Sequence, residues 1–119
     1  MKRLVLTAIL SSAITLLAVY AASAASTITR SVKLEKPRVA VTEVNHPPGV
    51  PREPYVRPTD QVIVFLDDCA YDRVDAATGQ KTRVNRKSGE VIWHDKGENA
   101  PTLINAGSKP YRTLVVALK

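Results

Sequence analysis

Apolar and polar residues alternate along most of the chain after residue 26, a pattern with a period of two. In the first such stretch, one face is formed by Ile28, Arg30, Val32 and Leu34 and the other by the residues between them. Successive side chains of a β-strand point to opposite sides, so this alternation is typical of half-buried strands. No segment after residue 26 repeats apolar residues with the period of a helix. The pattern therefore predicts an all-β domain.

Proline, glycine and clustered polar residues divide this pattern into short strands. Pro37 ends the first strand, and five prolines between Pro47 and Pro58 exclude a helix or a central strand there. Asp75–Gln80 is a predicted hairpin turn in which Gly79 takes positive φ, and 97–101 is a predicted loop. The remaining strands are expected at 38–45, 62–66, 71–74, 82–86, 91–94, 103–104 and 111–118. Short, regularly spaced strands are typical of a β-sandwich or barrel.

The first 25 residues follow a different pattern, in which a basic start precedes an apolar run. Lys2-Arg3 are followed by an apolar stretch over 4–20, and Ala22-Ser23-Ala24 supply the small side chains that a signal peptidase requires. This predicts a signal peptide over 1–25. The alternative is an uncleaved membrane anchor, since the run is nearly long enough to cross a bilayer. We expect the domain over 26–119 to be exported, periplasmic or secreted, and free of the membrane after cleavage.

The charge of this domain is modest. The chain has 17 Lys and Arg against 11 Asp and Glu, and loss of Lys2 and Arg3 with the signal lowers the net charge from +6 to about +4. Basic residues are scattered from Arg30 to Lys119, with a single Trp and a single Phe among them. Nucleic-acid binding needs a concentrated positive surface, usually with interleaved aromatic residues. We therefore interpret the charge as a solvated surface and expect no nucleic-acid partner.

Four further side chains are candidates for chemistry. Cys69 is the only cysteine, which excludes an internal disulfide, and we expect it to be buried as a small apolar residue. Trp93 falls within a predicted strand, which favours a core position over a ligand platform. His46 and His94 each fall at a strand end, where a solvated or capping histidine is expected. The alternative for the two histidines is a metal site completed by Cys69 or an acidic neighbour.

A set of residues between Gly49 and Asp68 shows a fixed spacing. Tyr55 and Arg57 follow Gly49 at positions six and eight, Gln61 follows four residues later, and Asp68 closes the segment. Residues 55, 57 and 61 share parity, so an extended chain would point their side chains the same way. This spacing resembles the first motif of the cupin superfamily, which has glycine, two histidines, glutamate and glycine at the five positions. The histidines and the glutamate, which are metal ligands in that motif, are all replaced here.

A later segment resembles the second cupin motif. Gly89 and Gly97 keep the spacing of its two glycines, and Asp95 takes the position of its proline. The position of its histidine falls on Ala100, or on Pro101 if one residue is inserted. Neither residue is a histidine, so this motif also lacks its metal ligand.

The resemblance covers most of the chain after residue 26, from the strand before the first motif to the final hairpin. It implies a cupin-like double-stranded β-helix, a jelly-roll barrel of about six to eight strands around a central pocket. Metal-dependent cupins bind iron, manganese, nickel or zinc there through three histidines and a glutamate. Tyr55, Arg57 and Gln61 form a poor donor set, because a protonated arginine repels a cation. We therefore expect neither a metal nor another cofactor.

We expect four polar residues to line the pocket: Tyr55, Arg57, Gln61 and Asn99. An arginine flanked by a phenol and an amide would bind a carboxylate or a phosphate, because its planar fork of donors matches these anions. The alternative is that Arg57 only forms an ion pair at the mouth of the barrel with a nearby carboxylate, Asp60, Asp67 or Asp68.

The sequence thus predicts an exported, metal-free module that binds a small anionic or polar ligand or a partner. One alternative is a cupin-type enzyme, an oxygenase or isomerase, with an atypical metal site. Another is a structural subunit whose pocket is vestigial. The resemblance also implies a homodimer, in which the early strand over 28–34 adds to the sheet of a neighbour. No catalytic residue is assigned, since no serine lies in a Gly-x-Ser-x-Gly context.

Overall fold

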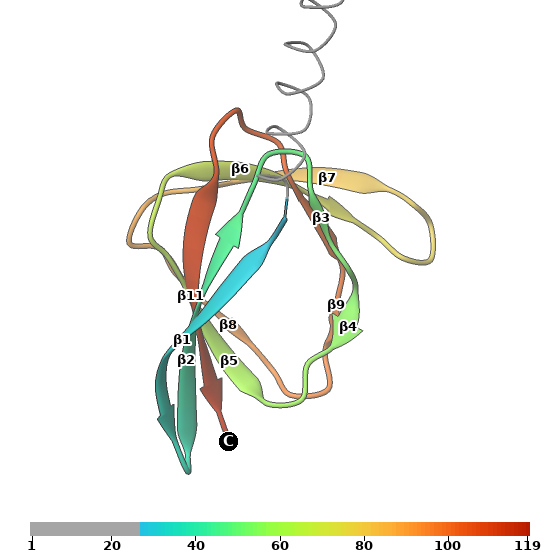
Figure 1. Cartoon of the computed structure of the whole chain (residues 1–119). Helices are drawn as coiled ribbons and strands as arrows, with labels where there is room; N and C mark the ends of the chain where they lie inside the picture. The colour runs from blue at the N-terminus through green and yellow to red at the C-terminus, as the bar shows by residue number, and fades with distance from the viewer. Residues whose placement is uncertain (1–26) are drawn as a thin grey trace, which may run out of the picture.

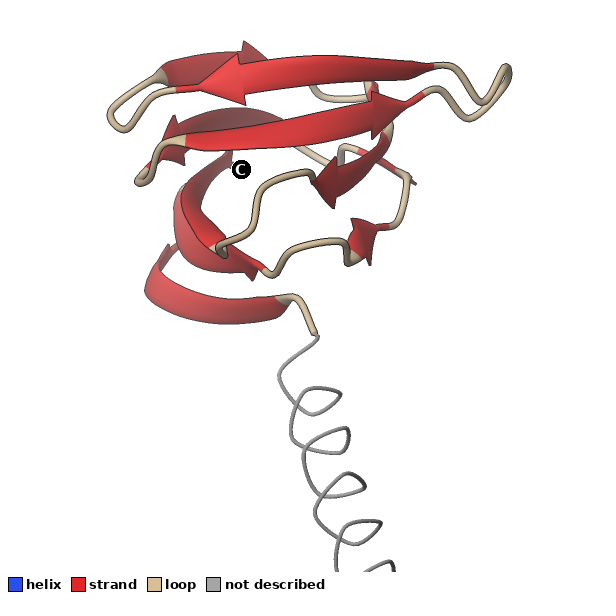
Figure 2. Cartoon of the chain, turned by 90° about the horizontal axis from the view of Figure 1, so that it is seen from above, coloured by secondary structure: helices blue, strands red, loops and turns tan. Residues whose placement is uncertain are grey.

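The computed structural model describes residues 27–119, which form a β-barrel (Figure 1). The strands in this part of the chain are β1 (Thr29–Lys36), β2 (Val39–His46), β3 (Pro51–Arg52), β4 (Tyr55–Val56), β5 (Asp60–Phe65), β6 (Cys69–Val74), β7 (Lys81–Arg86), β8 (Val91–His94), β9 (Asn99–Ala100), β10 (Thr102–Asn105) and β11 (Tyr111–Leu118). Residues 27–119 contain strands, turns and loops but no helix (Figure 2). The all-β prediction is confirmed.

The predicted signal peptide over 1–25 lies outside the described residues, so export stays a prediction. Within 27–119, no helix is long and apolar enough to cross a membrane.

Two sheets and one short strand pair make up the barrel. The larger sheet has the order β1-β2-β11-β5-β8, the second has the order β3-β10-β6-β7, and β4 pairs with β9. Neighbouring strands run antiparallel. In Figure 1 the larger sheet forms the left-hand wall, β6 and β7 lie across the top, and β3, β4 and β9 form the right-hand side. The sequence-distant strands β2, β11 and β5 therefore lie side by side in one wall.

The predicted turns form as local chemistry requires. Asp75 Oδ1 accepts hydrogen bonds from the backbone N–H groups of Ala77 and Thr78, at 2.9 and 3.0 Å. Gly79 has a φ of 72°, a conformation that side chains with a Cβ rarely adopt. The β6–β7 hairpin is thus closed by an Asx-type turn and a glycine, as the sequence predicts.

The loop predicted over 97–101 contains a strand, which corrects the sequence interpretation. Asn99–Ala100 forms β9 and pairs with β4, placing Tyr55 opposite Ala100. The proline-rich stretch also contributes two short strands, β3 and β4. These short strands form because they pair with residues about 45 positions away in the sequence. A local sequence pattern cannot show such pairing.

The alternation predicted for the first strand holds only as far as Val32. Val32 pairs with Thr42 and Leu34 pairs with Val41, so Lys33 is an extra residue in a β-bulge. A bulge shifts the phase of a strand by one position. Leu34 therefore lies on the face opposite to Arg30 and Val32.

The core lies between the two sheets and is largely aromatic. Its buried members are Ile63, Phe65, Tyr71 and Tyr111, with Cys69 partly buried against them. The rings of Phe65 and Tyr71 stack with centroids 6.1 Å apart, and those of Tyr71 and Tyr111 with centroids 6.2 Å apart. Burial raises the pKa of the Cys69 thiol to about 11, so the thiol is a packing group and not a thiolate at neutral pH.

Trp93 lies outside this core. It is 51% exposed, because β8 points Ile92 and His94 inward and Val91 and Trp93 outward. The prediction of a core position was therefore wrong.

Candidate functional site

The barrel encloses a cavity of about 440 Å³ between its two sheets. Its apolar surface comes from core residues of both sheets, chiefly Ile63, Phe65, Tyr71, Leu103 and Tyr111. A mostly apolar cavity of this size with a few placed polar groups is typical of sites for small ligands.

Tyr55, Arg57 and Gln61 meet at the wall of this cavity. Arg57 Nη1 donates hydrogen bonds to Gln61 Oε1 at 2.7 Å and to Tyr55 Oη at 3.1 Å. The Tyr55 hydroxyl in turn donates to Gln61 Oε1 at 3.3 Å. Arg57 and Gln61 are 4% and 5% exposed, whereas Tyr55 lies at the rim. The shared parity of these three positions predicts this convergence correctly.

Asn99, the fourth residue expected in the pocket, does not line the cavity. It is exposed on β9, opposite Val56. The adjacent Ala100 is 2% exposed, because alternation along β9 points residue 100 inward and residue 99 outward.

Arg57 has a different carboxylate neighbour from those expected. Its Nε lies 3.4 Å from Glu98 Oε2, and Glu98 is 46% exposed. The three expected carboxylates are engaged elsewhere: Asp60 accepts from Lys96 N, Asp67 pairs with Arg112 and Asp68 accepts from Ser88 N. The alternative of an ion pair at the mouth is therefore wrong in its partners. Glu98 is close to Arg57 but accepts no hydrogen bond from Nε.

Four more arginines reach the same cavity, one each from β1, β3, β6 and β7. Together with Arg57 they make five guanidinium groups in its lining: Arg30, Arg52, Arg57, Arg73 and Arg86. In the part of the chain that the structure describes, no aspartate or glutamate lines this cavity. Arg30 and Arg73 are exposed to solvent, whereas Arg57 is buried, so the interpretation of the positive charge as a solvated surface does not hold for Arg57.

Two of these guanidinium groups carry buried donors that are unused. The Nε atoms of Arg52 and Arg57 are buried and make no hydrogen bond within residues 27–119. Arg52 does donate from Nη2 to the carbonyl of Pro101, and burial lowers its pKa below the ordinary value. Both side chains also lie over the ring of Tyr55, with Cζ 5.3 and 5.5 Å from its centroid. Buried donors without partners are rare, so they mark a place where an acceptor can bind.

The sequence does indicate that three of these arginines point inward, because each lies two residues after an apolar or aromatic residue in the same predicted strand. Arg30 follows Ile28 by two residues, Arg73 follows Tyr71 and Arg86 follows Val84. Each therefore occupies a position that the alternation assigns to the inward face. Arg52, in the proline-rich stretch, has no such signal.

The two histidines also line the cavity, although at opposite ends. His46 pairs with Tyr111 at one end of β11. At the other end, Ala117 of β11 pairs with Gln61, and Gln61 pairs with His94. Six residues of strand separate these ends, or about 20 Å. His46 is 6% exposed and stacks on Tyr111 at 4.6 Å, so it is neither solvated nor a cap.

The residues at the positions of the cupin metal ligands do not fit a cation. The oxygens of Tyr55 and Gln61 already accept hydrogen bonds from the guanidinium of Arg57. A cation bound to these oxygens would lie beside a fixed positive charge. Within residues 27–119, no three His, Cys, Asp or Glu residues gather in a group that could hold a metal ion.

Comparison with known proteins identifies the fold. No family model and no curated protein matches the sequence. Among solved structures, a cupin domain from Bordetella pertussis Tohama I is similar, with a TM-score of 0.69 at 18% identity over 77% of this chain and 93% of that one. A protein with a double-stranded β-helix domain from Klebsiella pneumoniae has a TM-score of 0.58 at 24% identity over 79% of both chains. A putative mannose-6-phosphate isomerase from Ralstonia eutropha JMP134 has a TM-score of 0.57 at 16% identity over 80% of this chain and 87% of that one.

These likenesses, together with the sheet order, show that the protein has the cupin fold. The predicted double-stranded β-helix is thereby confirmed. Structural similarity at identities below 25% shows the fold alone. The function of the cavity must therefore be inferred from the residues that line it.

Proposed function

We propose that this cupin-fold protein binds a small anionic ligand, a carboxylate or a phosphate ester, in its central cavity. The observation that carries the proposal is the lining of five arginines, with no carboxylate from residues 27–119 among them. Charge–charge interactions are stronger in a partly buried cavity than in water, so these guanidinium groups favour an anion there.

The position of Arg57 supports a specific contact with that anion. Its Nη1 is held by Gln61 and Tyr55, which fixes the plane of the guanidinium before a ligand arrives. Its buried Nε remains available as a donor, as does that of Arg52. Pre-oriented guanidinium donors match the oxygens of carboxylates and phosphates.

The apolar floor indicates that the ligand also has a carbon skeleton. Ile63, Phe65 and Leu103 present hydrocarbon surface to the cavity. Arg57 donates a hydrogen bond to Gln61, at one end of β5. Arg86 donates one to Tyr71, and its Cζ lies 5.5 Å from the ring centroid of Phe65. Phe65 is four residues further along β5 than Gln61. Four residues of strand span about 13 Å. A molecule with anionic groups at both ends of an apolar or sugar-like body would engage both arginines.

The two alternatives predict different behaviour. A metal-dependent oxygenase or isomerase needs a donor set that this cavity does not offer. A structural subunit with a vestigial pocket needs no ligand, and the buried Nε donors of Arg52 and Arg57 would then stay without a hydrogen-bond acceptor. The arginine lining therefore favours binding over both.

A thermal-shift screen at low ionic strength tests the proposal. We expect inorganic phosphate, succinate, citrate and mannose 6-phosphate to raise the unfolding temperature, because each binds only the folded cavity. Unphosphorylated mannose is the matched control and should have no effect. A flat response to every anion, or an equal response to mannose and its phosphate, would contradict the proposal.

A further inference from the structure

A histidine–glutamate pair lies beside Arg57 at one end of the cavity. His94 lines the cavity, and its Nδ1 lies 2.8 Å from Glu98 Oε2. The same carboxylate oxygen lies 3.4 Å from Arg57 Nε. His94 also pairs across the sheet with Gln61, whose Oε1 accepts a hydrogen bond from Arg57. The imidazole ring is therefore a close neighbour of the guanidinium group assigned to the anion.

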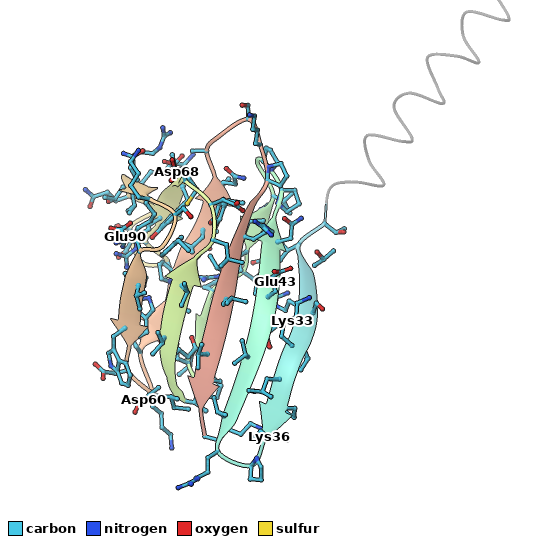
Figure 3. The ribbon with its side chains drawn as sticks, turned by 90° about the vertical axis from the view of Figure 1, so that its left-hand side faces the viewer. Lys33, Lys36, Glu43, Asp60, Asp68 and Glu90 are labelled. Atoms are coloured by element: carbon cyan, nitrogen blue, oxygen red, sulfur yellow. The ribbon has the colours of Figure 1, made fainter. Side chains whose placement is uncertain are left out.

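Backbone hydrogen bonds fix the turn that carries Glu98. Gly97 N donates to the carbonyl of Arg57 at 2.8 Å, and Arg57 N donates to the carbonyl of Glu98 at 3.0 Å. One residue earlier, Lys96 N donates to Asp60 Oδ1 at 2.8 Å. Figure 3 shows Asp60 at the lower end of the larger sheet. The turn is thus tied to the end of the barrel at which the imidazole ring lies.

The contact with Glu98 determines which nitrogen of His94 carries the proton. A carboxylate only accepts hydrogen bonds, so Nδ1 must donate to it. Burial, and then the charge of Arg57, lower the pKa of His94 below its ordinary value, although Glu98 opposes the shift. The ring is therefore neutral at neutral pH, with its proton on Nδ1. Its Nε2 then has a free lone pair and can only accept a hydrogen bond.

An open acceptor is unusual at this end of the cavity, because the polar groups around it are donors or are already engaged. The guanidinium of Arg57 only donates. Gln61 Oε1 accepts from Arg57 and Tyr55, and Tyr55 Oη accepts from Arg57. Within residues 27–119, Nε2 of His94 makes no hydrogen bond. It can therefore accept one from a ligand.

We propose that the ligand of this cavity carries a hydroxyl group close to its anionic group, and that His94 binds this hydroxyl. The inference rests on the proposed anion binding and narrows the ligand to a hydroxy carboxylate or a hydroxyl-bearing phosphate ester. Arg57 donates to the anionic oxygens, and the hydroxyl donates to Nε2 of His94. A site that hydrogen-bonds a hydroxyl discriminates against the analogue without it, since the acceptor is then left unpaired.

Matched pairs of ligands test this inference. Calorimetric titration at neutral pH compares each enantiomer of malate with succinate, which lacks only the hydroxyl group. A second comparison sets glycerol 3-phosphate against propyl phosphate. The hydroxylated member of at least one pair should bind at least about fivefold more tightly, the change expected for one hydrogen bond. The two comparisons also distinguish a carboxylate from a phosphate as the anionic group.

Variants of the pair show whether His94 causes the preference. His94→Phe keeps a ring but has no acceptor, so the affinity ratio within the preferred pair should fall to about one. Glu98→Gln no longer forces the proton onto Nδ1, because an amide donates as well as accepts, and should lower the ratio at least about twofold. Trp93→Phe is the matched control, since residue 93 is exposed on the same strand, and should leave the ratio unchanged.

The tautomer can be measured independently of binding. Heteronuclear NMR that correlates ring nitrogens with ring protons should show Nε2 of His94 unprotonated in the free protein, with His46→Phe used to assign the signals. A proton on Nε2, ratios near one for both pairs, or a preference that survives His94→Phe would overturn this inference and leave anion binding intact. No binding of any of these anions would overturn the proposed function as well.

Discussion

Replacement of Arg57 by methionine should weaken the binding of anions such as mannose 6-phosphate by about 10- to 100-fold, the range expected for loss of hydrogen bonds to a charged group. Arg57 is 4% exposed and its guanidinium is held in place by Gln61 and Tyr55. Methionine fills a similar volume but offers neither charge nor donors. The measurement is calorimetric titration of mannose 6-phosphate into both proteins.

The variant should still fold. The hydrogen bond from Tyr55 to Gln61 does not involve Arg57, and Glu98 is 46% exposed and keeps its contact with His94 Nδ1 at 2.8 Å. Arg83→Met is the matched control, because Arg83 is exposed on β7 and pairs with Asp72 outside the cavity. A folded Arg57→Met protein that binds the anion as tightly as the wild type would show that this arginine serves the barrel and not a ligand.

The second large effect is a loss of stability in acid that depends on His46. Burial, and then the charges of Arg52 and Arg30, lower the pKa of His46 from its ordinary 6.5 to about 4. Between these two values the unfolded chain binds a proton that the folded chain does not, so the free energy of unfolding falls as the pH falls. The contribution is fully present above pH 6.5 and amounts to about 3 kcal/mol.

Urea unfolding at several pH values between 7 and 4, in buffers without polyvalent anions, measures this effect. His46→Phe keeps a ring against Tyr111 but cannot be protonated, so its stability should change little over this range. His94→Gln is the comparison, because the pKa of His94 is also lowered by burial but Glu98 opposes the shift. It should keep most of the acid sensitivity of the wild type. An equal slope in the wild type and in His46→Phe would assign the effect to other groups.

The sequence predicts most of the fold because the fold depends on local alternation and on turns. The strand at 111–118, the hairpin at 75–80 and the central strand near 62–66 form as expected. The bulge at Lys33 and strand β9 are not predictable in this way, because each depends on a partner strand distant in sequence. Leu34 changes face for that reason alone.

The candidate site divides in the same way. Parity along one extended segment is enough to bring Tyr55, Arg57 and Gln61 together. Arg30, Arg73 and Arg86 come from three other strands. Their side chains reach the same cavity only because the strands close into a barrel. Arg52 has no sequence signal of any kind. The charge of the cavity is thus a tertiary property, whereas Tyr55, Arg57 and Gln61, at the positions that the resemblance assigns to metal ligands, can be identified from the sequence.

The most direct test is to locate an anion in a crystal. Selenate is a tetrahedral dianion close to phosphate in shape, and its selenium can be placed by anomalous scattering. Crystals soaked in selenate should show it inside the barrel, bonded to the Nε atoms of Arg52 and Arg57, which make no hydrogen bond within residues 27–119. Selenate found only on exposed surface lysines and arginines, with none in the cavity, would contradict the account.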